Sequence, residues 1–121
     1  FNRDIIFTGR LPDKELNSIL ASSLALVFVP KFEGFGIPLI EAMQCNVPII
    51  ASDVTSIPEV VGDAALLVDP FSVDELKNAM YKIETDPAFR SELIKKGRVR
   101  KEFFSWQKTA DLLWSSIEKC F

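Results

Sequence analysis

Two glutamates flank a glycine-rich turn in the stretch EGFGIPLIEA, residues 33–42. Glu33 precedes the turn and Glu41 follows it, eight positions further along the chain. Carboxylates accept charge-assisted hydrogen bonds from hydroxyl groups, so two separated carboxylates can hold hydroxyls on either side of one ligand. A mostly helical path of this length separates them by about 10 Å, which is unsuited to a shared proton or a shared metal ion.

The turn between the glutamates predicts a binding site for an anion. Pro38 suits the first turn of a helix, where its missing N–H group costs little, and this places the helix N-terminus at Phe35 and Gly36. N–H groups at such an end lack partners within the helix, and the helix dipole attracts negative charge. We expect the N–H groups of Gly36, Ile37 and Leu39 to point outward, and the two glycines to let a ligand approach the backbone. A diphosphate with hydroxyl-bearing groups on both sides, as in a nucleotide sugar, fits this arrangement.

The elements that must position this turn alternate between strands and helices. Short β-rich runs followed by segments of helical period are typical of an α/β fold with a parallel sheet and crossover helices. The expected order is βαβαββααα. Strands are predicted at residues 5–7, 24–30, 47–52 and 64–68, and helices at 12–22, 38–45, from 72, at 86–97 and from 105.

Side-chain patterns predict how the later helices begin and what they bury. Ser72 and Glu75 have the spacing of a capping box, and Ser105 is an expected N-cap. The apolar positions of the helix from 72, namely Leu76, Ala79, Met80 and Ile83, are expected to face the core. The last helix carries a similar stripe of Trp106, Ala110, Leu113, Trp114 and Ile117, and both tryptophans are predicted to be core. We also expect Cys45 to be a buried small side chain.

Charge and hydropathy exclude several function classes. The chain has 14 basic and 17 acidic side chains, a net charge of −3 and no long block of either sign, so no nucleic-acid partner is expected. Its longest apolar run, residues 24–29, is far shorter than the roughly 20 residues that span a bilayer, so no transmembrane segment is expected.

Cysteine and histidine usage narrows the chemistry. Cys45 and Cys120 match no metal-ligand spacing, which favours reduced thiols in the cytoplasm. The sequence contains no histidine, which removes every catalytic arrangement that uses an imidazole base. Any chemistry at the site must therefore use carboxylates, lysine, arginine or backbone dipoles.

The whole chain resembles one enzyme family. EGFGIPLIEAM resembles the motif of two glutamates with seven residues between them in the retaining glycosyltransferases of family 4, or group 1, which have the two-domain GT-B architecture. FTGRLPDKELNSIL resembles the strand and helix before that motif, ASDVTSIPEVVGDAALLVDP the next two strands, and FSWQKTA the C-terminal helix. The resemblance implies that residues 1–121 form part of the donor-nucleotide domain, Rossmann-like, with its first strands and the acceptor domain absent.

The resemblance also implies roles for individual residues. Glu33 would be the catalytic-site carboxylate that contacts hydroxyls of the donor sugar, and Glu41 would bind the ribose hydroxyls. The sugar and phosphates are expected to contact Glu33, Gly34, Phe35, Gly36 and Ile37, and the nucleotide to contact Leu39 and Glu41. Members of the family need no metal, because helix dipoles and cationic side chains stabilise the leaving diphosphate, so no metal or cofactor is expected.

Two cationic residues near the motif have open assignments. Arg10, at the end of the first expected strand, is either a nucleotide contact or a surface side chain. Lys31 stands where the family usually has a serine, and either contacts the phosphates or lies in solvent.

The family's usual strand order is 3-2-1-4-5-6, in which this chain would supply the third to sixth strands. The first of these would then lack its neighbours. We therefore expect either that residues 5–7 pair directly with residues 24–29, or that the chain self-associates.

The function implied by the resemblance is hexosyl transfer from a nucleoside diphosphate sugar, with retention, to a glycan or lipid-linked acceptor. The form of residues 55–70 is similar to that of bacterial mannosyltransferases, which favours a GDP- or UDP-hexose, with GDP-mannose first, and polysaccharide or lipopolysaccharide assembly. The isolated chain is expected to be inactive. The expected location is the cytoplasm, with peripheral contact to the inner face of the membrane through the absent domain.

Two alternatives stay open. One is a nucleotide-sugar epimerase of the same architecture, and the other is a non-catalytic interaction module or pseudoenzyme. Sugar transfer by the full-length protein distinguishes the first interpretation from both, and nucleotide-independent self-association favours the module.

Overall fold

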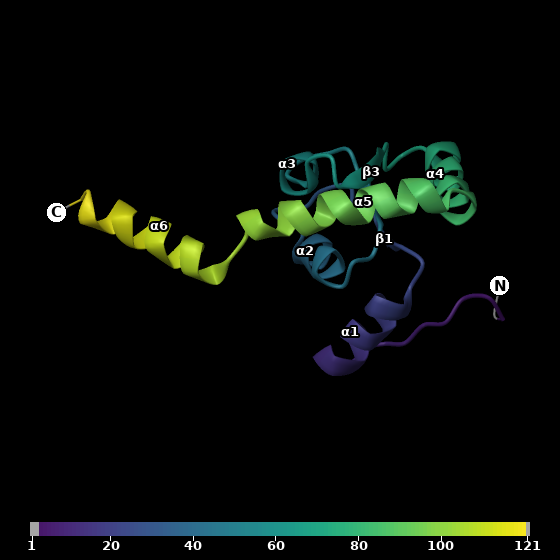
Figure 1. Ribbon diagram of the computed structural model, residues 1–121, viewed down its shortest axis with the longest axis horizontal. Coiled ribbons are helices and arrows are strands. Elements are labelled where there is room, and N and C mark those ends of the chain that lie inside the picture. Colours follow the sequence, from purple (N-terminus) through teal and green to yellow (C-terminus); the bar gives the residue numbers. More distant parts are fainter. Residues whose placement is uncertain (1–2, 121) are drawn as a thin grey trace.

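The computed structural model describes residues 3–120 and centres on a parallel sheet (Figure 1). Its strands are β1 (Leu26–Phe28), β2 (Ile49–Ser52) and β3 (Ala65–Val68), and among residues 3–120 they form one sheet in the order β1-β2-β3. The register pairs Val27 with Ile50 and Ile50 with Leu66. Because every strand runs the same way, the loops that follow them meet at one edge of the sheet.

Helices connect and cover the strands. They are α1 (Asp13–Ser22), α2 (Ile37–Gln44), α3 (Ile57–Val61), α4 (Val73–Thr85), α5 (Pro87–Arg100), the 3-10 turn η1 (Lys101–Phe103) and α6 (Trp106–Glu118). The predicted α/β class with a parallel sheet and flanking helices is confirmed. The short helix α3 lies within residues 53–63, for which neither a strand nor a helix was predicted from the sequence.

The core forms on both faces of the sheet. Neighbouring residues of a strand point to opposite faces, so Ile49 and Ala51 pack with α2 and α3, whereas Ile50 packs with Ala79 of α4 and Leu93 of α5. All four residues of β2 are buried, as expected for a central parallel strand.

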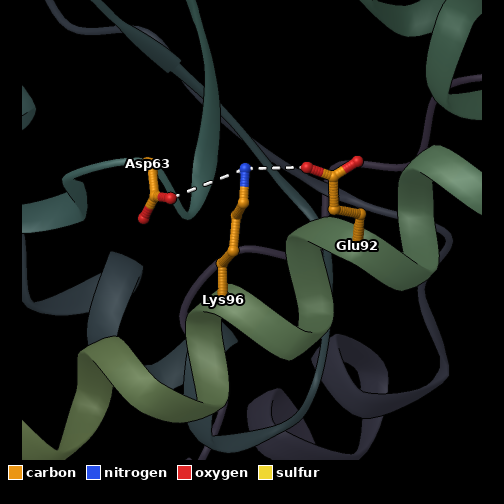
Figure 2. A network of polar contacts seen from close by, with 3 residues as sticks. All are labelled: Asp63, Glu92 and Lys96. Atoms are coloured by element: carbon orange, nitrogen blue, oxygen red, sulfur yellow. Dashed lines mark ion pairs between the residues drawn. The ribbon is translucent and has the colours of Figure 1, made fainter.

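Helix α5 contacts helices from both faces of the sheet. It runs along the sheet between α2 and α4 and contacts both (Figure 1). A Cβ at Gly97 would lie 3.4 Å from Cγ of Met43, so the absent side chain lets α5 approach α2 closely. Figure 2 shows Lys96 of α5 between Asp63 and Glu92, with ion-pair distances of 3.5 and 2.8 Å. The hydrogen bond to Glu92 raises the pKa of Lys96 above its ordinary value of 10.5.

Local capping predictions are confirmed, with one correction. Ser72 accepts the N–H of Glu75, and Ser105 accepts the N–H of Lys108. The reciprocal half of the predicted capping box is wrong, because the Glu75 carboxylate accepts the N–H of Asp69 at 2.9 Å. That bond fixes the turn after β3.

The predicted strand at residues 5–7 is wrong. Ile5, Ile6 and Phe7 adopt no regular secondary structure and are exposed, so the direct pairing with residues 24–29 is also wrong. Their side chains are 50%, 83% and 92% exposed, and β-forming residue types without a surface to pack against do not form a strand. The outer edge of β1 has no strand partner within residues 3–120, and self-association at this edge stays a prediction.

The predicted burial of the last helix is also wrong. Figure 1 shows α6 extending away from the sheet, and Trp106 and Trp114 are 85% and 62% exposed. The stripe has helical period, but period alone does not supply a surface for it to pack against. Met80 of α4 is likewise exposed, and Cys45 is only half-buried.

Candidate functional site

The turn between the two glutamates lies at the carboxyl end of β1 and begins α2, as predicted. Gly36 is the N-cap with φ of +90°, and Pro38 stands in the first turn. A Cβ at Gly36 would lie 2.7 Å from Cδ1 of Leu39, so glycine is required there for both backbone and packing. A Cβ at Gly34 would meet nothing within 4 Å. Gly34 therefore leaves open space beside the turn.

Glu33 organises the turn through its own carboxylate. Its Oε1 accepts the N–H of Gly34 at 3.0 Å and the N–H of Phe35 at 3.4 Å, and the residue is half-buried. Within residues 3–120, Oε2 of Glu33 has no hydrogen-bond partner. One carboxylate oxygen thus holds the backbone and the other stays available.

The N–H groups at the start of α2 divide into used and open donors. Leu39 donates to the Gly36 carbonyl at 3.0 Å, so the expectation of an outward N–H at Leu39 is wrong. The helix starts with a tight bond of the i to i+3 type, which consumes that donor. The N–H groups of Gly36 and Ile37 donate to no acceptor in the described part of the chain. Two backbone donors remain at the positive end of the helix.

The other predicted residues of α2 differ in how far they are exposed. Glu41, one turn into α2, is half-buried, and its carboxylate forms no hydrogen bond or ion pair with residues 3–120. Ile37 is exposed at the start of the helix, whereas the Leu39 side chain is fully buried in the core behind it.

The two cationic candidates differ. Lys31 places its Nζ 4.9 Å from the centre of the Phe71 ring, on the loop that follows β3. Arg10 is exposed ahead of α1 and makes no hydrogen bond or ion pair within residues 3–120. The structure thus places Lys31 beside a neighbouring loop of the same sheet edge and does not join Arg10 to the turn.

Hydroxyl residues at the end of β2 and in the loop after it hold the turn in place, and sequence reasoning missed them. Thr55 Oγ1 accepts the N–H of Glu33 at 3.3 Å, and Ser56 Oγ donates to the Glu33 carbonyl at 2.8 Å. Ser52 Oγ donates to the carbonyl of Pro30 at 2.8 Å. The run of hydroxyls in SDVTS, directly after a buried strand, could have indicated this contact, because loops after parallel strands share one edge.

Aromatic packing supports the turn from its other side. The rings of Phe35 and Phe104 meet edge to face, with centroids 5.7 Å apart and planes at 79°. Arg100 lies over Phe104 at 5.3 Å and donates to the carbonyl oxygens of Val60, at 2.9 Å, and Glu59. The end of α5 therefore links α3 to the ring that supports Phe35.

A shallow pocket of about 250 Å³ adjoins the same sheet edge. It is lined by Asp53, Val54, Leu67, Val68, Asp69, Pro70 and Glu75. Within residues 3–120, no three His, Cys, Asp or Glu side chains converge as metal ligands. No described helix has the length and apolar character needed to cross a membrane.

A family model supports the resemblance. The model for "Glycosyl transferases group 1" matches residues 1–100.

Two curated relatives carry mannosyltransferase names. The chain is 39% identical over 103 residues to "O-antigen chain mannosyltransferase B" of Escherichia coli, covering 85% of this chain and 27% of that protein. It is 40% identical over 121 residues to "MMP alpha-(1->4)-mannosyltransferase" of Mycolicibacterium hassiacum, covering 96% of this chain and 29% of that protein. The chain thus spans less than a third of the length of either relative.

A solved structure has the same fold over nearly the whole chain. Sucrose-phosphate synthase from Thermosynechococcus elongatus superposes with a TM-score of 0.85 at 31% identity, covering 98% of this chain and 31% of that one. The arrangement of sheet, turn and helices described above is therefore that of an established fold.

Proposed function

Because this chain belongs to the group 1 glycosyl transferases, we propose that the protein carrying it transfers a hexose from a nucleoside diphosphate sugar to a glycan or lipid-linked acceptor, with retention of configuration. GDP-mannose is the first candidate donor, since relatives with about 40% identity are named mannosyltransferases.

The observation that carries this proposal is the start of α2. N–H groups of buried Gly36 and exposed Ile37, both without an acceptor within residues 3–120, stand between two carboxylates, with Glu33 before the turn and Glu41 one turn inside the helix. The diphosphate binds the open donors, where the helix dipole favours negative charge. Glu41 accepts hydrogen bonds from the ribose hydroxyls. Lys31, two residues before Glu33 in the loop after β1, adds positive charge that attracts the diphosphate.

Glu33 binds the donor sugar through its free oxygen. Oε1 is held by the N–H groups of Gly34 and Phe35, which fixes the orientation of the carboxylate. Oε2 then accepts a sugar hydroxyl without breaking those bonds. A preoriented carboxylate loses little freedom on binding, so its hydrogen bonds contribute to binding the transition state.

The leaving diphosphate is stabilised by fixed charges of the protein. As the glycosidic bond breaks, negative charge grows on the phosphate beside the N-terminus of α2 and is stabilised by the backbone donors there. This chemistry uses no metal and no cofactor.

The full reaction belongs to a longer protein. The chain spans 27% of O-antigen chain mannosyltransferase B, so residues outside it are expected to bind the acceptor, and the isolated chain is expected to be inactive in transfer. We place the reaction in the cytoplasm, with peripheral membrane contact through those other residues.

A transfer assay tests the proposal. The full-length protein is incubated with GDP-mannose, UDP-glucose or ADP-glucose and a lipid-linked glycan acceptor, and NMR determines the anomeric configuration of the product. We expect retention, and a rate about ten- to a hundredfold lower in Glu33→Gln, since charge-assisted hydrogen bonds are lost. Inversion, or epimerised nucleotide sugar formed without acceptor, would contradict the proposal.

A further inference from the structure

Thr55 adopts a backbone conformation that its side chain disfavours. Its φ is +53°, in the left-handed region, where a β-branched residue crowds its own backbone. Glycine would adopt the same φ without this cost. Such a conformation persists only where the surrounding structure determines it, and it is concentrated at functional sites.

The contacts of Thr55 show what that conformation achieves. Its Oγ1 accepts the N–H of Glu33 at 3.3 Å, while Ser56 Oγ donates to the carbonyl of the same Glu33 at 2.8 Å. The two hydroxyls come from neighbouring positions and hold both polar groups of one residue's backbone. The Glu33 side chain then turns onto the N–H groups of Gly34 and Phe35.

We propose that Thr55 is a positioning residue for the donor site, which sets the place of the Glu33 carboxylate by holding the Glu33 backbone together with Ser56. This inference rests on the proposed function. Thr55 acts through Glu33 and does not itself touch the sugar. Its role explains why a β-branched hydroxyl residue occupies a position at which glycine is less strained.

The substitution Thr55→Gly separates positioning from stability. Glycine removes the hydroxyl but relieves the strain at positive φ, so the variant should melt at the same temperature as the wild type or higher. Loss of one hydrogen bond that orients Glu33 should weaken donor use about three- to tenfold. Thr55→Ser keeps the hydroxyl and should stay within about twofold of the wild type.

Thr85→Ala serves as the matched control. Thr85 is exposed at the end of α4, where its hydroxyl bonds to the Tyr81 carbonyl at 2.8 Å. This hydrogen bond lies within α4, so its loss breaks no contact with the turn. Its substitution should leave donor use unchanged.

The experiment measures melting temperature and the kcat and KM for GDP-mannose in the full-length wild type and these variants. Amide hydrogen exchange at Glu33, Gly34 and Phe35 is followed in parallel without donor. We expect Thr55→Gly to show faster amide exchange at Glu33 and a raised donor KM, with no fall in melting temperature. Thr55→Ser should have the exchange rate and the donor KM of the wild type.

The outcomes distinguish the two claims. The positioning role would be overturned if the donor KM were unchanged in Thr55→Gly, or if a raised donor KM came with a lower melting temperature. Neither result would contradict the proposed transferase activity. A wild type that uses no nucleotide sugar would overturn the proposed function and this inference with it. Unchanged exchange at Glu33 in Thr55→Gly would overturn the inference whatever the enzyme assay gives.

Discussion

Gly34 and Gly36 stand two positions apart and carry different constraints. Gly36 needs its positive φ, and a methyl group there would overlap the Leu39 side chain. Gly34 has neither constraint, so only open space beside the turn distinguishes it from other residues. The first glycine is therefore available to a ligand, whereas the second is required by the fold.

This contrast gives a prediction for alanine substitutions. Gly36→Ala should lower the free energy of unfolding by about 1–3 kcal/mol, because the alanine is strained and crowded. Gly34→Ala should change it by no more than about 0.5 kcal/mol. Urea denaturation of both variants tests the difference, and equal stability of the two would show that Gly36 is not constrained as described.

At the residue scale, the sequence predicted the helix start and missed the bonds around it. Proline in the first turn and glycine before it are local features, so Gly36 and Pro38 were placed correctly. The bonds from Thr55 and Ser56 to Glu33 join residues 22 and 23 positions apart and depend on the sheet that brings two loops together. The hydrogen bonds from the N–H groups of Gly34 and Phe35 to the Glu33 carboxylate depend on the backbone position that Thr55 and Ser56 fix.

At the scale of elements, the turn is supported by the end of α5 as well as by the loop after β2. Phe104 follows η1 and packs edge to face on Phe35, and Arg100 binds both the α3 carbonyls and the face of Phe104. Movement at the end of α5 would therefore reach the turn through one aromatic contact.

Removing that contact should affect both stability and the site. Phe104→Ala should lower the free energy of unfolding by about 1–3 kcal/mol, since the ring is half-buried and loses an aromatic pair. Phe103→Ala is the neighbouring control, and its more exposed ring should cost less. Chemical denaturation and amide exchange at Phe35 are the measurements. An equal decrease in the free energy of unfolding in both variants would argue against a specific contact between Phe104 and the turn.

Elements were predictable where their determinants are local. The caps at Ser72 and Ser105 need only a hydroxyl and an N–H three residues on, and both are present. Burial of α6 and pairing of residues 5–7 require a partner surface that no local pattern supplies. Those two predictions were accordingly wrong.

At the scale of the whole molecule, the parallel sheet gathers the candidate site. The loop after β1 carries Glu33, the loop after β2 carries Thr55, and the loop after β3 carries Phe71, against which Lys31 lies. Alternating strands and helices predicted this class of fold, and a parallel sheet of any such order brings its loops to one edge. The exact pairing of loop residues required the structure.

The most direct test of the donor site is calorimetry of nucleotide binding. GDP, UDP and ADP, each with and without its hexose, are titrated into the wild type and Glu41→Ala, with Glu84→Ala on the exposed surface of α4 as control. We expect selective binding of one nucleotide, weakened by about 1.5–3 kcal/mol in Glu41→Ala because charge-assisted ribose bonds are lost, and unchanged in Glu84→Ala. Equal affinity of the wild type and Glu41→Ala for that nucleotide would contradict a donor site at the start of α2.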